Sequence, residues 1–132
     1  MEPEATVFVV DDEPAVLEAV AEMVRTIGLR VQSYHSAQEF LEAYKPVGPG
    51  CLVLNVGMPG MSGLELQNEL ARTGNTLPVI VITGYANERV EEEAMKAGAV
   101  DFLRKPFRMQ ELCDSIQKAI QSDREKWRAG EP

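Results

Sequence analysis

The sequence predicts an α/β domain in which a five-stranded parallel sheet carries helices on both faces. Short apolar runs of four to six residues recur along the chain, as in strands that are buried within a parallel sheet. Stretches with the apolar period of an α-helix separate these runs. The two kinds of segment alternate strictly, which is the order expected of a doubly wound sheet.

Five segments are expected to form the strands. Four of them are mostly apolar and suit the interior of the sheet, whereas the second alternates apolar and polar residues and suits an edge. In chain order they are TVFVV (6–10), LRVQSY (29–34), CLVLNV (51–56), PVIVIT (78–83) and DFLR (101–104).

Helices are expected after each strand, and capping residues mark several of their ends. Ser36 with Glu39, and Ser62 with Glu65, have the spacing of a capping box. Asn87 is expected to cap the fourth helix. The glycines expected to end the first and fourth helices are Gly28 and Gly98.

Length and charge restrict the class of protein. The 132 residues fit one domain, which we expect to span 1–122, with 123–132 as a helical exit or tail. A net charge of −8 argues against nucleic-acid binding by this segment, because phosphates would be repelled. No apolar stretch is long enough to span a membrane. Cys51 and Cys113 lie far apart in apolar surroundings and are expected to be reduced thiols in a cytoplasmic protein.

Polar residues follow four of the expected strands at the point where each strand ends. They are two acids, Asp11 and Asp12, an amide, Asn55, a hydroxyl, Thr83, and an ammonium, Lys105. Ligands of an open parallel sheet bind beyond the carboxyl ends of its strands. Adjacent acids suit Mg²⁺, which prefers oxygen ligands, and the hydroxyl and ammonium suit a phosphoryl group held on that metal.

Each of these residues also has a purely structural interpretation. The acids could cap the first helix, the amide could belong to a turn, the threonine suits any strand, and the lysine could be a solvated charge. Coincidence explains the same placement after four strands poorly, so a site is the better interpretation. His35 follows the second strand without a visible partner and is assigned no role.

In order and spacing, the motifs VVDDEP, MPGMSGLEL, VITGY and MKAGAVDFLRKPF resemble those of receiver domains of bacterial two-component response regulators. The resemblance covers about residues 5–121. It implies the flavodoxin-like strand order 2-1-3-4-5. It also implies that a sensor histidine kinase supplies a phosphoryl group to an aspartate at the end of the third strand.

The resemblance assigns the metal site and the acceptor position. Asp11 and Asp12 would hold Mg²⁺ together with the backbone carbonyl of Gly57. The acceptor position, which also belongs to the metal site, falls on Asn55. An amide oxygen carries no formal charge and is a poor nucleophile, so no acyl phosphate is expected there. The loss of one charge should also weaken Mg²⁺ binding.

The remaining roles follow from the same resemblance. Thr83 matches the switch hydroxyl, Lys105 the lysine that pairs with the phosphoryl group, Phe102 the switch aromatic, and Pro106 the cis-proline of the family. The signalling face would be formed by the fourth helix, the fifth strand and the fifth helix. It would include Val90, Glu91, Ala94, Phe102, Arg104 and some of the residues within 108–120.

Asn55 has two explanations. It is an engineered block of phosphorylation, or the chain is a natural receiver that does not use phosphate. Gly57 stands where the family often has a larger residue, commonly arginine, and this second departure favours natural divergence.

The function expected is therefore a receiver that takes no phosphoryl group at this position, and not an enzyme. The alternative is an interaction module on the same fold that works without phosphorylation. A flavin carrier is disfavoured, because DDEP places carboxylates where a phosphate-binding loop would lie. The expected partners are a sensor histidine kinase or its partner protein, and a C-terminal DNA-binding output domain of the helix-turn-helix type outside this chain. A monomer is expected, with a weak dimer through the signalling face.

Overall fold

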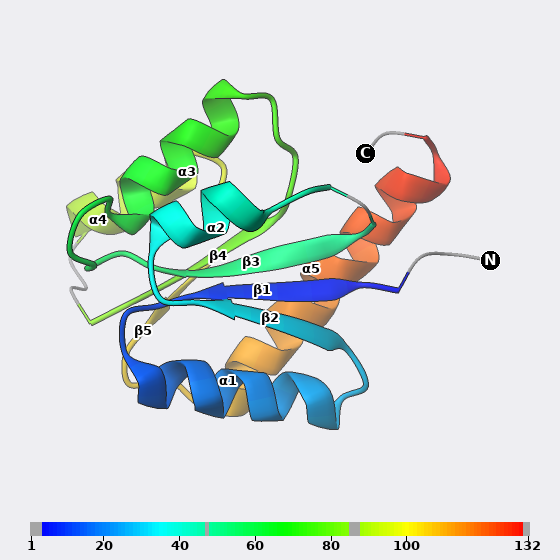
Figure 1. The fold of residues 1–132 in the computed structure, drawn as a ribbon, viewed down its shortest axis with the longest axis horizontal. Helices are drawn as coiled ribbons and strands as arrows, with labels where there is room; N and C mark the ends of the chain where they lie inside the picture. Colours follow the sequence, from blue (N-terminus) through cyan, green and yellow to red (C-terminus); the bar gives the residue numbers. More distant parts are fainter. Residues whose placement is uncertain (1–3, 47, 85–87, 131–132) are drawn as a thin grey trace.

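The computed structural model describes residues 4–46, 48–84 and 88–130 and confirms the expected α/β fold (Figure 1). Strands and helices alternate along the chain. The strands are β1 (Thr6–Val10), β2 (Arg30–Tyr34), β3 (Gly50–Asn55), β4 (Val79–Thr83) and β5 (Asp101–Arg104). The helices are α1 (Pro14–Thr26), α2 (Ala37–Ala43), α3 (Gly63–Arg72), α4 (Glu88–Lys96) and α5 (Met109–Arg128).

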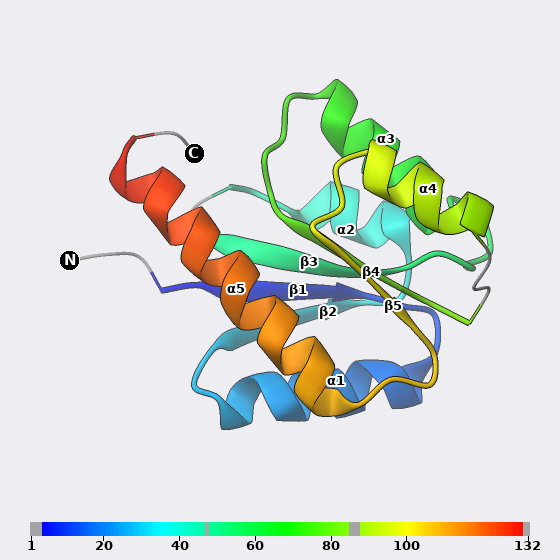
Figure 2. The ribbon, with the colours of Figure 1, turned by 180° about the vertical axis from the view of Figure 1, so that it is seen from behind.

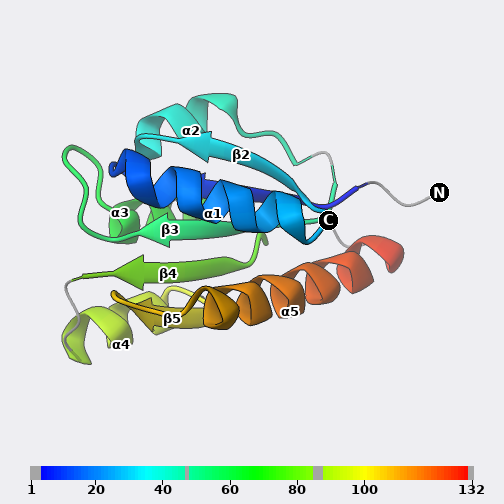
Figure 3. The ribbon, with the colours of Figure 1, turned by 90° about the horizontal axis from the view of Figure 1, so that it is seen from below.

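All strand pairs are parallel, and the sheet has the order β2-β1-β3-β4-β5. This confirms the 2-1-3-4-5 topology and the edge position of the second strand. The fifth strand, expected in the interior, is the other edge strand and is only partly buried, because it pairs with β4 alone. Because the strands are parallel, their carboxyl ends all lie at one end of the sheet, and α5 ends at the opposite end (Figure 3).

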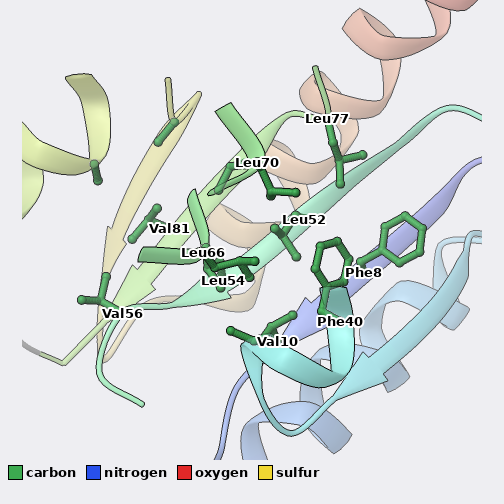
Figure 4. Packing of buried hydrophobic residues seen from close by; sticks show 14 of the residues in the cluster. Phe8, Val10, Phe40, Leu52, Leu54, Val56, Leu66, Leu70, Leu77 and Val81 are labelled. Carbon is green, nitrogen blue, oxygen red and sulfur yellow. The ribbon is translucent and has the colours of Figure 1, made fainter. Parts of the chain in front are cut away.

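Two apolar clusters hold the helices to the sheet. Alternate residues of β1 point to opposite faces: Phe8 belongs to the cluster beneath α2, α3 and α4, and Val9 to the cluster beneath α1 and α5. The ring of Phe8 meets that of Phe40 on α2 edge-on, with centroids 5.7 Å apart (Figure 4). Figure 2 shows α5 crossing the opposite face of the sheet.

The helix caps follow the sequence in part. At α3 the capping box is complete, with Ser62 and Glu65 each bonding the other's backbone N–H. At α2 the Glu39 N–H donates to the Ser36 hydroxyl. The second bond of the expected capping box, from the Ser36 N–H to the Glu39 side chain, is not among the hydrogen bonds of the described residues. The predicted cap Asn87 lies outside the described residues. Gly28 and Gly98 both have positive φ, as their C-terminal capping role requires.

Helix α5 crosses position 122 without a break, so the domain boundary expected there stays a prediction. At the next position, Asp123 is 3 % exposed, and its carboxylate accepts a hydrogen bond from the backbone N–H of Gly50 at 2.8 Å. No helix in the described part of the chain is long and apolar enough to cross a membrane.

Candidate functional site

The predicted polar residues lie at or just after the carboxyl ends of four strands, and these ends lie at one end of the sheet (Figure 3). Asp11 follows β1, Asn55 and Thr83 are the last residues of β3 and β4, and Lys105 follows β5. The strands that carry them are held in register, with Asn55 paired to Ile82. Asp11, Asn55 and Thr83 are at most 4 % exposed, whereas Asp12 is exposed and Lys105 is half-buried, so the polar cluster extends from the buried strand ends to the surface.

The Asn55 amide is the centre of this polar cluster, the acidic pocket. Its Nδ2 donates toward Asp11 Oδ1 at 3.3 Å, Asp12 Oδ1 at 3.3 Å and the backbone oxygen of Gly57 at 3.1 Å. These are the three protein groups that the family resemblance assigns to the metal. An amide nitrogen has only two protons, so the three acceptors share them. The amide therefore supplies partial positive charge where two carboxylates converge.

Lys105 lies on the other side of the first acid. Its Nζ is 3.2 Å from Asp11 Oδ2 and 3.2 Å from Glu13 Oε1. Its backbone N–H donates to the Thr83 carbonyl at 2.8 Å, which ties the end of β5 to β4. The peptide bond from Lys105 to Pro106 is cis, as the resemblance implies.

Asp11 is fully buried, and its environment is both polar and charged. Oδ1 accepts the Glu13 N–H at 3.0 Å, an Asx turn that leads into Pro14 at the start of α1. Burial raises the pKa of Asp11, and the Glu13 N–H and the Lys105 ammonium oppose that rise. An isolated carboxylate would be unfavourable here, which accounts for the donors gathered around it.

The oxygen atoms around Asn55 are of the type that binds a hard divalent cation, but the Asn55 amide nitrogen already contacts them. The Asp11 and Asp12 carboxylates and the Gly57 carbonyl are the ligand type that Mg²⁺ takes. All three point at the Asn55 nitrogen, so the amide would have to turn its oxygen inward to join them as a ligand. Within the described residues, no group of three or more His, Cys, Asp or Glu side chains could hold a metal.

The signalling role of the face formed by α4, β5 and α5 stays a prediction, and the structure corrects one of its expected residues. Phe102 on β5 is half-buried and packs against the cluster beneath α2, α3 and α4. Arg104 pairs with Glu91 of α4 at 3.0 Å, so the helix and strand are joined at the surface. Ala94, which was expected on this face, is fully buried, because it is the residue by which α4 packs onto the core.

Three residues were missed from the sequence. The sequence pattern gave Glu13 no role in the site, but its carboxylate lies 3.2 Å from the Lys105 ammonium. Gly63 begins α3 where a Cβ would lie 2.3 Å from the backbone oxygen of Asn55, so only glycine fits without a shift. Gln67 is buried, and its side-chain amide donates a hydrogen bond to a backbone oxygen of α4. The motif around Gly63 was recognised, but nothing in the sequence pattern identifies the partner of Gln67.

The two cysteines take no part in this pocket. Cys51 on β3 and Cys113 on α5 are free and buried, as expected. Burial raises the pKa of the Cys51 thiol strongly, so it is a core residue and not a nucleophile.

Comparison with known proteins agrees with this geometry. Residues 7–117 match the response regulator receiver domain family. The chain is 45 % identical over 117 residues to response regulator protein TmoT of Ectopseudomonas mendocina, covering 89 % of this chain and 53 % of TmoT. It is 48 % identical over 101 residues to transcriptional regulatory protein FixJ of Azorhizobium caulinodans, covering 76 % of this chain and 48 % of FixJ.

The fold is also found in solved structures. That of response regulator StyR superimposes with a TM-score of 0.91 at 42 % identity, covering 98 % of this chain and 65 % of StyR. The chain thus spans about half the length of the curated relatives it matches.

Proposed function

This chain belongs to the response regulator receiver domain family, and on that premise we propose that it is a two-component receiver whose acceptor position, Asn55, takes no phosphoryl group. The observation that carries the proposal is the direction of the Asn55 amide. Its nitrogen donates toward Asp11, Asp12 and the Gly57 carbonyl, and the side chain has no carboxylate oxygen to attack phosphorus.

The same contacts support weakened Mg²⁺ binding. Receiver domains generally bind Mg²⁺ at their acidic pocket, and Asp11, Asp12 and the Gly57 carbonyl would hold it here. When bound, the ion would neutralise charge on an incoming phosphoryl group. The Asn55 amide competes for these same oxygens and contributes no charge of its own. Binding therefore has to displace hydrogen bonds without the attraction of a third carboxylate.

Receiver domains are generally signal-transduction modules rather than enzymes, so the role lies in partner binding. We propose a sensor histidine kinase or its partner protein as the upstream contact. A DNA-binding output domain outside this chain is supported by the transcriptional regulators among its relatives. We further propose a monomer with a weak dimer contact through α4, β5 and α5. The buried free thiols support a cytoplasmic location.

The alternative is an interaction module on the same fold that acts in one state, whatever the phosphorylation chemistry. The hydrogen-bonded amide favours it, because a pocket satisfied internally needs no ligand to hold its shape. A ligand shifts such a domain only by preferring one of its states.

Incubation with acetyl phosphate and Mg²⁺, followed by intact-mass spectrometry, tests the proposal. The unmodified chain should gain no phosphate mass, whereas Asn55→Asp should gain one, mapped to residue 55. Asn68→Asp, which adds an exposed aspartate on α3, is the matched control and should stay unmodified. A phosphate adduct on the unmodified chain at residue 55 or a neighbouring acid would refute the proposal. An unmodified Asn55→Asp variant would show that the pocket is not a working receiver site.

A further inference from the structure

Gln67 on α3 is a buried amide that lies outside the acidic pocket. It is 2 % exposed, and its Nε2 donates to the backbone oxygen of Ala94 on α4 at 2.7 Å. Its Oε1 is buried and has no hydrogen-bond partner among the described residues. Glutamine is seldom buried, and an unpaired buried oxygen is unfavourable. Packing alone therefore does not explain a glutamine at this position, since an apolar side chain would fill the same space.

The oxygen that Gln67 contacts belongs to the C-terminal cap of α4. The Ala99 N–H donates to the same Ala94 oxygen at 3.1 Å, and the Gly98 N–H donates to the Met95 oxygen at 3.1 Å. With Gly98 at a φ of 102°, these are the two bonds of a Schellman motif. Gln67 thus holds the cap that ends α4 just before β5 begins.

Helix α4 packs on the core through two apolar residues, Ala94 and the half-buried Val90. Its sequence is ERVEEEAMK, and Ala94 is its one buried residue within those described. The ion pair between Glu91 and Arg104 is exposed at the surface, where such pairs contribute little. The Gln67 bond is a buried polar contact that adds to this apolar packing and fixes the C-terminal end of the helix.

The other end of α3 rests on the backbone of the acceptor position. The Gly63 N–H donates to the Val56 oxygen at 3.0 Å, and the Gly63 Cα packs against the Asn55 carbonyl. Gln67 comes four residues later, so it lies on the same side of α3 as Gly63. Figure 2 shows α4 lying beside α3. One rigid helix thus has the residue-55 backbone at one end and α4 against its side.

We propose that Gln67 is a positioning residue that ties the capped end of α4 to α3, and through α3 to the backbone at residue 55. A change at the acidic pocket then reaches α4 without passing through Thr83 or Phe102. The inference does not require that Asn55 resist phosphorylation, and its tests use no phosphoryl donor. Spatial proximity alone does not establish coupling, so the tests measure it directly.

The first experiment replaces the amide with a side chain of similar length that cannot donate. Gln67→Met should speed hydrogen exchange of the Ala97, Gly98 and Ala99 amides about fivefold, the equivalent of one typical hydrogen bond. Denaturant stability should be unchanged or raised, because the unpaired Oε1 is removed as well. Gln67→Leu is a second variant with the same expectation. Gln38→Met, exposed on α2, is the control and should change neither quantity.

A residue that merely fills space would behave differently. Its replacement would lower global stability or change nothing, and the amides of 97–99 would exchange as before. Unchanged local exchange in a folded Gln67→Met variant overturns the proposal.

The second experiment measures the coupling itself by NMR. Asn55→Asp with Mg²⁺ should shift the amide resonances of 97–99, and the same change made in a Gln67→Met background should shift them at least about twofold less. Equal shifts in both backgrounds, or no shift at these amides in either, would overturn the coupling. A failure of phosphorylation at residue 55 would leave both measurements intact, so the two proposals are tested separately.

Discussion

Two buried aspartates lie at opposite ends of the same sheet, and their surroundings differ in kind. Asp11, at the carboxyl ends of the strands, is contacted by Lys105 and the Asn55 amide, with the carboxylates of Asp12 and Glu13 close by. Asp123, at the amino ends, accepts hydrogen bonds from the Gly50 N–H and the Trp127 side chain, and the charge of Lys126 also acts on it.

The surroundings indicate different roles: Asp11 belongs to a candidate binding site, whereas Asp123 stabilises the fold. Acids clustered around one cation repel each other, and here the Asn55 amide and the Lys105 ammonium offset that repulsion. A single acid bonded by neutral donors satisfies groups that folding would otherwise leave unpaired. Burial raises the pKa of both aspartates, so the pKa shift alone would not distinguish them. The additional carboxylates beside Asp11 distinguish them, because both aspartates also have a lysine charge acting on them.

The largest expected change in stability is at the amino ends of the strands, where Asp123 lies. Asp123→Ala leaves the Gly50 N–H buried without an acceptor, and we expect it to lower the free energy of unfolding by about 2 kcal/mol. Asp114→Ala, which removes an exposed acid from the same helix, is the control and should change stability by less than about 0.5 kcal/mol. Urea denaturation measures both. Equal effects of the two variants would mean that Asp123 is not the support described here.

A smaller loss of stability, which Mg²⁺ should reverse, is expected at the acidic pocket. Without metal, Asn55→Asp should lower stability by about 1–2 kcal/mol, because the amide donor is lost and a third carboxylate joins Asp11 and Asp12. With Mg²⁺ the same variant should recover, since a ligand that binds only the folded state stabilises it. Thermal melts with and without Mg²⁺ measure this. The same response to Mg²⁺ in the unmodified chain and the variant would contradict a metal site weakened by the amide.

The sequence was sufficient for the acidic pocket and insufficient for the amino ends of the strands. Asp11, Asn55, Thr83 and Lys105 each follow an apolar run, so strand alternation alone predicts that they share an edge. Asp123 meets Gly50 across 73 positions of the chain, and no local pattern pairs a helix residue with the first residue of a strand. It stood in a charged segment that suggested an exit. Gln67 escaped notice for the same reason, because its partner is a backbone oxygen on another helix.

The smallest effect is a pH dependence that distinguishes Asp123 from an acid held by a cation. Burial raises its pKa in the folded state above the ordinary value of 3.8, although the Gly50 N–H, the charge of Lys126 and the Trp127 side chain oppose the rise. The folded state then binds a proton more tightly than the unfolded state. The stability that this contributes is fully present below the unfolded pKa and is lost as the pH rises through the folded pKa.

The stability gap between the unmodified chain and Asp123→Ala should therefore widen on acidification, and Asp114→Ala should show no such trend. Urea denaturation at a series of pH values measures the gap. A gap that narrows on acidification would mean that Asp123 is held ionised, as an acid beside a cation would be, and the contrast between the two ends of the sheet would fail.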